Sequence, residues 1–153
     1  MAIEAPISRF KKNNLKIYIA VCLALMIWCI YDAHFNEKFI EKHTDADGNA
    51  TGWLVVNKKA PPYLVGATLL MGVYLVVLGR KKIVAEDNEL VISANERIPY
   101  DSIQKIDKTH FDSKGTFIFT YKDGDGNEIA RKLSDRTYDN LKAILDHLVE
   151  KIS

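Results

Sequence analysis

The sequence predicts a membrane α-helical hairpin of two transmembrane helices joined to a small α+β domain. Two long uncharged apolar runs lie in the first half of the chain, and the hydrophobic period shortens to that of β-strands after residue 83. The last turns of the chain read as one amphipathic helix. From these observations we expect a basic N-terminal segment at 1–14, transmembrane helices at 15–35 and 60–80, an extracytoplasmic loop at 36–59 and a cytoplasmic domain at 83–153.

The second apolar run, from Ala60 to Gly79, has twenty residues and no charge. A helix of that length reaches about 30 Å, the hydrocarbon thickness of a bilayer. Pro61 and Pro62 are expected in its first turn, where a missing N–H costs little. A core helix of a soluble domain would show a polar face, and this run shows none. We therefore predict a transmembrane helix.

The first apolar run, residues 17–31, has fifteen uncharged residues and is short for a span. Lys16 can extend its ammonium outward, and Leu15 with residues 33–35 can lengthen the helix. A cleaved signal peptide is the alternative, because a basic segment precedes the run. No small-x-small cleavage site follows, so an uncleaved span is favoured.

Basic residues gather beside the two apolar runs. Residues 1–16 carry a net charge of +3, whereas residues 83–153 hold ten basic and fourteen acidic groups, a net of −4. The positive-inside rule places both termini in the cytoplasm, although Lys58 and Lys59 in the loop weaken the bias. The side chains expected to anchor the chain at anionic headgroups are Arg9, Lys11, Lys12, Lys16, Arg80, Lys81 and Lys82.

Small and aromatic residues in the spans suggest further roles. Ala20 and Ala24, and Thr68 and Gly72, have the four-residue spacing at which small residues let helices pack closely. Rings are favoured at the membrane interface, where we place Tyr18, Trp28, Tyr31 and Tyr63.

The two cysteines, Cys22 and Cys29, lie seven residues apart in the first run. On a helix that is about 10 Å, too far for a disulfide between them. We interpret them as small apolar residues of a membrane helix. An intermolecular disulfide or a reactive thiol stays open as an alternative.

Residues 45–49 and 123–127 share the pattern Asp-x-Asp-Gly-Asn, which matches the first ligand positions of a calcium loop. That loop also needs glycine at its sixth position and glutamate at its twelfth, and both segments lack both. We therefore expect turns and no calcium, the second turn joining two strands. Between the spans, residues 35–43 are expected to prolong the first helix, and residues 53–56 to form a short strand.

After residue 83 the chain reads as an antiparallel meander closed by a helix. The strongest strand is 116–121, with Phe117, Phe119 and Tyr121 on one face, and hairpin turns are expected at 112–115 and 123–126. Apolar residues then follow at helical spacing to the end of the chain: Tyr138, Leu141, Ile144, Leu145, Leu148, Val149 and Ile152. The residues expected to cap the start of this helix are Ser134, Asp135 or Thr137.

ELVISANERIPYDSIQKID at 89–107 and LSDRTYDNLKAILDHL at 133–148 carry a family resemblance. With two preceding spans they resemble small bacterial membrane proteins that bear a pleckstrin-homology-like (PH-like) domain. The resemblance covers roughly half of the chain and rests on soft patterns of apolar and turn residues. It implies a non-enzymatic interaction or assembly module. Because the domain is shorter than a full PH domain, it also implies that one strand is missing or irregular.

Catalytic and nucleic-acid functions lack motifs in this sequence. The four histidines lie in three separate regions without metal-ligand spacing, and no phosphate loop, Cys/His cluster or nucleophile elbow is present. No basic patch suits nucleic acid. Residues 86–97 hold four acids and one arginine, which opposes inositide binding. We expect no enzyme activity, no cofactor and no metal.

The sequence thus favours a non-catalytic integral membrane protein of the bacterial inner membrane. It would act as an accessory or scaffold subunit, with the lipid bilayer and other membrane subunits, or copies of itself, as partners. The alternative is a membrane-anchored module that senses a lipid or a small ligand. An enzyme using His110 and Asp112 is the third hypothesis.

Overall fold

The computed structural model describes residues 2–152 and divides them into two units. One unit contains residues 13–76; the other combines the described N-terminal residues up to Lys12 with those from Val77 onward. The coarse fold class is confirmed, because the chain has two long apolar helices, antiparallel sheets and a C-terminal helix.

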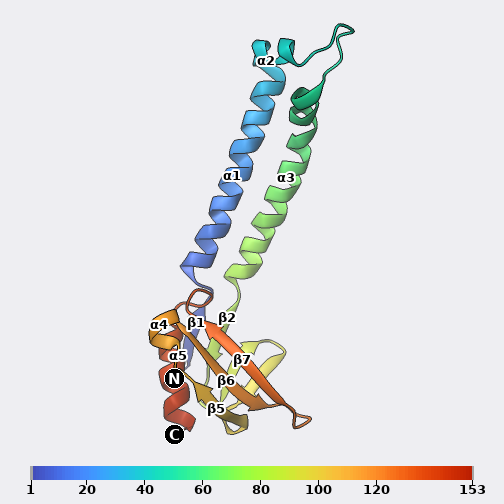
Figure 1. The fold of residues 1–153 in the computed structure, drawn as a ribbon. Helices are drawn as coiled ribbons and strands as arrows, with labels where there is room; N and C mark the ends of the chain where they lie inside the picture. Colours follow the sequence, from blue (N-terminus) through green and yellow to red (C-terminus); the bar gives the residue numbers. More distant parts are fainter. Residues whose placement is uncertain (1, 153) are drawn as a thin grey trace. The chain divides into compact units, whose positions relative to one another are not determined.

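Two long helices and one short helix make up the hairpin (Figure 1). They are α1 (Arg9–His34), α2 (Glu37–Lys42) and α3 (Gly52–Gly79). At 1.5 Å per residue, α1 and α3 are each about 40 Å long, and both are long and apolar enough to cross a membrane.

The start of α3 differs from the prediction. Residues 53–56, expected to form a strand, are the first turn of this helix, and Pro61 and Pro62 lie well inside it. Leu54 is completely buried and Asn57 is nearly so. These two positions are three apart and share one helix face, and their burial explains why a strand-like apolar sequence is helical here.

The segment expected to prolong α1 forms a separate helix. The side chain of Asn36 accepts a hydrogen bond from the N–H of Phe39 at 3.3 Å and so caps the start of α2. Because Asn36 caps α2, residues 37–42 form a new helix and do not continue α1 as predicted.

The other unit contains two antiparallel sheets (Figure 1). In each sheet, strands that are consecutive in the chain are neighbours. The four-stranded sheet contains β1 (Ile3–Pro6), β2 (Lys82–Ala85), β3 (Glu89–Ser93) and β4 (Glu96–Pro99). A 3-10 turn, η1 (Tyr100–Ser102), leads to the three-stranded sheet of β5 (Ile103–Asp107), β6 (Thr116–Lys122) and β7 (Glu128–Ser134). Two further helices are α4 (Phe111–Lys114) and α5 (Leu141–Ile152).

The N-terminal segment contributes a strand that the sequence analysis missed. β1 pairs with β2 in a register that runs from Ile3 opposite Ala85 to Pro6 opposite Lys82. On its other side, the carbonyl of Pro6 accepts a hydrogen bond from the N–H of Asp139 at 2.8 Å. The segment is therefore held between β2 and the approach to α5.

The core lies between the two sheets and α5. Phe117, Phe119 and Tyr121 alternate inward along β6, as predicted, and all three are buried. The face of α5 that covers them consists of Leu141, Ile144, Leu145 and Leu148, each with at most 4% of its surface exposed. Helical spacing places these four side chains on one stripe, which explains why the terminal helix docks here.

The cap predicted for this helix is wrong. The helix α5 begins at Leu141, whereas Ser134 and Thr137 belong to a preceding turn in which the N–H groups of Thr137 and Tyr138 donate to the carbonyl of Ser134. Asn140, with a φ of 60°, separates that turn from the helix.

Both predicted turns of the meander join strands. Residues 123–126 connect β6 to β7, as predicted. Residues 112–115 lie between β5 and β6, but they form the single helical turn α4, which ends at Gly115 with a φ of 63°.

Candidate functional site

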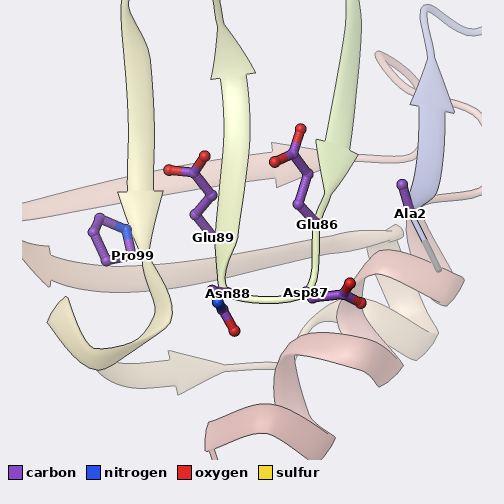
Figure 2. Close-up of a pocket in the computed structure, with 6 residues that line it drawn as sticks. All are labelled: Ala2, Glu86, Asp87, Asn88, Glu89 and Pro99. Carbon is purple, nitrogen blue, oxygen red and sulfur yellow. The ribbon is translucent and has the colours of Figure 1, made fainter.

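An open cavity lies at the turn between β2 and β3 (Figure 2). It has a volume of about 640 Å³ and is lined by Ala2, Glu86, Asp87, Asn88, Glu89 and Pro99. Figure 2 shows the side chains of Glu86, just after β2, and Glu89, at the start of β3, side by side, with Asp87 and Asn88 in the turn between them.

Backbone hydrogen bonds fix this turn. The N–H of Glu86 donates to the carbonyl of Glu89 at 2.9 Å, and the N–H of Tyr100 donates to the carbonyl of Asn88 at 3.1 Å. The buried Tyr100 hydroxyl donates to the carbonyl of Glu86 at 2.6 Å. The ring of His147, on α5, lies edge-on to Tyr100 with 5.9 Å between ring centroids. The turn is thus tied to η1 and α5.

The electrostatics of the cavity are negative. Burial, and to a smaller extent the neighbouring carboxylates of Asp87, Glu86 and Glu89, together raise the pKa of Tyr100 to about 12. Arg97 forms an ion pair with Glu89, with 2.6 Å between its Nη1 and the carboxylate, so the positive charge of Arg97 is already paired. The carboxylates that line this cavity would repel a phosphorylated headgroup. Its lining residues also contain no nucleophile beside a base.

The two Asp-x-Asp-Gly-Asn loops have one hydrogen-bonding pattern. The Asp45 Oδ1 accepts from the N–H groups of Asp47 and Asn49 at 3.1 and 2.7 Å. The Asp123 Oδ1 accepts from those of Asp125 and Asn127 at 2.9 and 2.8 Å. These carboxylates close their own loops, and no group of three possible metal ligands occurs among residues 2–152.

Asp123 also shows the electrostatic effect of this loop geometry. The N–H and side-chain amide of Asn127 both donate to the carboxylate of Asp123, and these hydrogen bonds lower its pKa.

The structure pairs the chain segments that lie beside the two basic flanks, because β1 precedes the first flank and β2 begins at Lys82. The N–H of Ile7 donates to the carbonyl of Lys81 at 3.2 Å, although these residues are far apart in the sequence. Lys82 forms an ion pair with Glu4 across β1 and β2, and the backbone N–H of Arg9 donates to Asp139 at 3.0 Å. The side chains of Arg80 and Lys81 are exposed. The anchoring role of all seven basic residues stays a prediction.

The proposed packing positions differ in exposure. Ala20 and Ala24 are exposed, whereas Thr68 and Gly72 are half-buried. The half-buried positions in the middle of α1 are Ile19, Cys22, Met26 and Cys29. Small-residue packing through Ala20 and Ala24 is therefore not seen within a single chain, and such packing against another chain stays a prediction.

The predicted interface aromatics are all exposed: Tyr18, Trp28, Tyr31 and Tyr63. Trp28 has an additional role, because its Nε1–H donates to Asp32 at 2.7 Å. A group of polar side chains gathers there, at the end of the hairpin where α1 is followed by α2 and α3 begins.

This group was not predicted from the sequence, where Asp32 marked only the end of the uncharged run at 17–31. Asp32 lies within α1 and only 8% of its surface is exposed. It accepts hydrogen bonds from Trp28 and Asn36, which are spaced four residues on either side, and from Asn57 of α3. The i, i+4 spacing of Trp28, Asp32 and Asn36 was a visible signal.

Comparisons with protein-family models, with curated proteins and with solved structures find no match to this chain.

Proposed function

We propose that this protein is a non-catalytic integral membrane protein that acts as an accessory or scaffold subunit of a larger membrane complex. The observation that supports this proposal is the place of the hairpin in the chain. The chain leaves the sheet unit after β1 and returns to it at β2, and these two strands are hydrogen-bonded neighbours. The domain is thus joined to its anchor by two covalent connections, a construction suited to presenting a binding surface at a membrane.

The domain is proposed to be PH-like. A four-stranded and a three-stranded antiparallel sheet, followed by a terminal helix that covers their core, agree with the resemblance in 89–107 and 133–148. β1 adds a strand from outside 83–153, where the resemblance had implied a missing one.

The membrane location is supported by the exposed apolar side chains of the helices. On α3, Leu69, Leu70 and Val73 are 65–74% exposed. Exposure of such apolar surface is unfavourable in water and favourable in the hydrocarbon of a bilayer. The pairing of β1 with β2 supports a topology in which both ends of the hairpin lie on one side of the membrane. The basic flanks favour the cytoplasmic side of a bacterial inner membrane.

Sheet edges offer surfaces for partners. β7 has seven residues and pairs only with β6 within the described chain, so its outer backbone groups are available to an added strand. The acidic cavity at the β2–β3 turn would repel an anionic lipid headgroup, which argues against the alternative that the domain senses such a lipid.

Purification from the native membrane in a gentle detergent tests the proposal. Mass determination and identification of co-purifying chains should find at least one other membrane protein at stoichiometric ratio. Recovery of this chain alone, as a monomer, after purification that preserves known membrane complexes of the same cells would contradict a subunit role. Recovery as a homo-oligomer would favour self-assembly or ligand sensing.

A further inference from the structure

A second cavity lies at the turn end of the hairpin, entirely within residues 13–76. Its volume is about 330 Å³, at the lower end of the range of roughly 300–1,000 Å³ that is usual for small-molecule sites. The aromatic side chains on its wall are Trp28, Phe39 and Trp53, and its polar groups are Asp32 and Asn57. It is therefore an apolar cavity with a single acidic group.

The carboxylate of Asp32 is buried without a cation. Its partners are the neutral N–H groups of Trp28, Asn36 and Asn57, at 2.7, 2.8 and 3.5 Å. No lysine, arginine or histidine among residues 2–152 forms an ion pair with it. The carboxylate thus has three hydrogen-bond donors but no counter-charge within the described residues, and a cationic ligand would supply one.

The aromatic rings select the kind of cation. The N–H edge of Trp28 is directed to Asp32, and the rings of Trp28 and Trp53 have no aromatic partner within the described chain. Faces of such rings attract ammonium groups, most strongly when the cation is alkylated and weakly hydrated. A metal ion would need several oxygen ligands, and the two asparagine amides direct their NH₂ groups to Asp32.

We propose that this cavity binds an organic ammonium group, with Asp32 supplying the counter-charge and Trp28 and Trp53 the aromatic wall. A lipid headgroup and a free solute can both supply this chemistry. The proposal does not depend on the scaffold function, because it concerns only the hairpin.

The two tryptophans of the chain both line the cavity, so intrinsic fluorescence reports on it directly. The full-length protein in phosphatidylglycerol nanodiscs, which contain no ammonium headgroup, is titrated with choline and with tetramethylammonium. The neutral isostere of choline, 3,3-dimethylbutanol, is the matched control ligand. We expect a saturable change with both cations and none with the neutral compound. No saturable change with the cations, or an equal change with the neutral compound, overturns the proposal.

Variants distinguish loss of the Asp32 charge from loss of the fold. Asp32→Asn should weaken choline binding about tenfold or more, as expected for loss of a buried counter-charge. Asp47→Asn, on the exposed loop of the same unit, should bind as the unmodified protein does. Trp53→Leu keeps Asp32 and leaves Trp28 as the reporter, and it should also weaken binding. Unchanged affinity in both Asp32→Asn and Trp53→Leu, with helical circular dichroism intact, overturns the assignment.

A second membrane composition identifies the source of the cation. In phosphatidylcholine nanodiscs the choline titration is suppressed if the headgroup fills the cavity, and it is unchanged if the ligand is a free solute. Both results support the site, provided that the Asp32 dependence has been seen first.

Discussion

At the scale of single residues, Gly115 shows how backbone conformation constrains the domain. It ends α4 with a φ of 63°, and a methyl group at this position would overlap the carboxylate of Asp135. The carbonyl of Gly115 also accepts the N–H of Asp135 at 2.9 Å, so the two segments cannot separate freely. Glycine is needed here mainly for its conformation, because the exposed carboxylate of Asp135 can turn away from an added methyl group.

Gly115→Ala should therefore lower the free energy of unfolding by about 1–3 kcal/mol. Two control variants isolate the causes. Gly126→Ala has a φ of 84° but open space around it, so it tests conformational strain alone. Gly124→Ala has open space and no positive φ, and should be nearly neutral. Chemical denaturation followed by circular dichroism measures the three; a neutral Gly115→Ala would contradict the account.

Tyr100 makes a pH-dependent contribution to stability. Its pKa is raised to about 12 in the fold, mainly by burial, from an ordinary value of about 10. The folded state therefore holds the proton more tightly, so this contribution is complete below pH 10 and is lost as the pH rises from 10 to 12. Burial also raises the pKa of Tyr121 and of Tyr138, so part of the slope belongs to them.

Tyr100→Phe should make the unfolding midpoint fall less steeply between pH 10 and 12. Below pH 10 it should cost about 1 kcal/mol, because the hydrogen bond to the carbonyl of Glu86 is lost. The exposed Tyr63→Phe is the control and should leave the pH profile unchanged. An identical slope in all three proteins would show that Tyr100 titrates normally.

Residue-level prediction from the sequence succeeded where the period was clear and failed where a contact was distant. Phe117, Phe119 and Tyr121 could be placed in the core because alternation along a strand is local. The burial of Asp32 depends on Asn57, twenty-five residues away on another helix, and no local pattern reveals that pairing.

At the scale of elements, α5 could be predicted from the sequence and β1 could not. The helix α5 carries an apolar stripe over three turns, and its position could be predicted except for its first residues. β1 has four residues, and its partner strand begins at Lys82, after the whole hairpin. A strand this short is formed by tertiary pairing and has too few residues to show a period.

β1 should be required for a stable domain. Ala5 in β1 is completely buried and lies opposite Ile83, which is also buried. A protein in which residues 2–8 are joined to 81–153 by a four-residue turn should unfold cooperatively, whereas residues 83–153 alone should be markedly less stable. Thermal unfolding of the two soluble proteins compares them, and equal midpoints would show that β1 is dispensable.

The docking of α5 should account for a large part of the domain's stability. Leu148→Ala removes a fully buried side chain and should cost about 2–5 kcal/mol. Lys142→Ala, on the exposed face of the same helix, is the matched control and should change stability by less than about 0.5 kcal/mol. Urea unfolding of the full-length protein in detergent measures both, and a small effect of Leu148→Ala would argue that α5 is only loosely attached.

At the scale of the whole molecule, the central feature is the order of the hairpin and the strands along the chain. A hairpin of two apolar helices is inserted between two paired strands of one domain. The hairpin and the later strands can each be predicted from the sequence, because each has its own period. The strand before the hairpin that completes the sheet after it cannot, since it depends on backbone pairing between distant segments.

The measurement that tests the insertion of a membrane hairpin between β1 and β2 most directly is the sidedness of three sites in intact cells that express the protein. Single cysteines are introduced as Ala2→Cys, Asp47→Cys and Ser113→Cys, all at exposed positions, in a chain in which Cys22 and Cys29 are replaced by alanine. A membrane-impermeant maleimide should label only Asp47→Cys from outside. Ala2→Cys and Ser113→Cys should react only after the membrane is permeabilised. Labelling of the positions 2 and 113 from opposite sides would contradict the pairing of β1 with β2 and the insertion of a membrane hairpin between them.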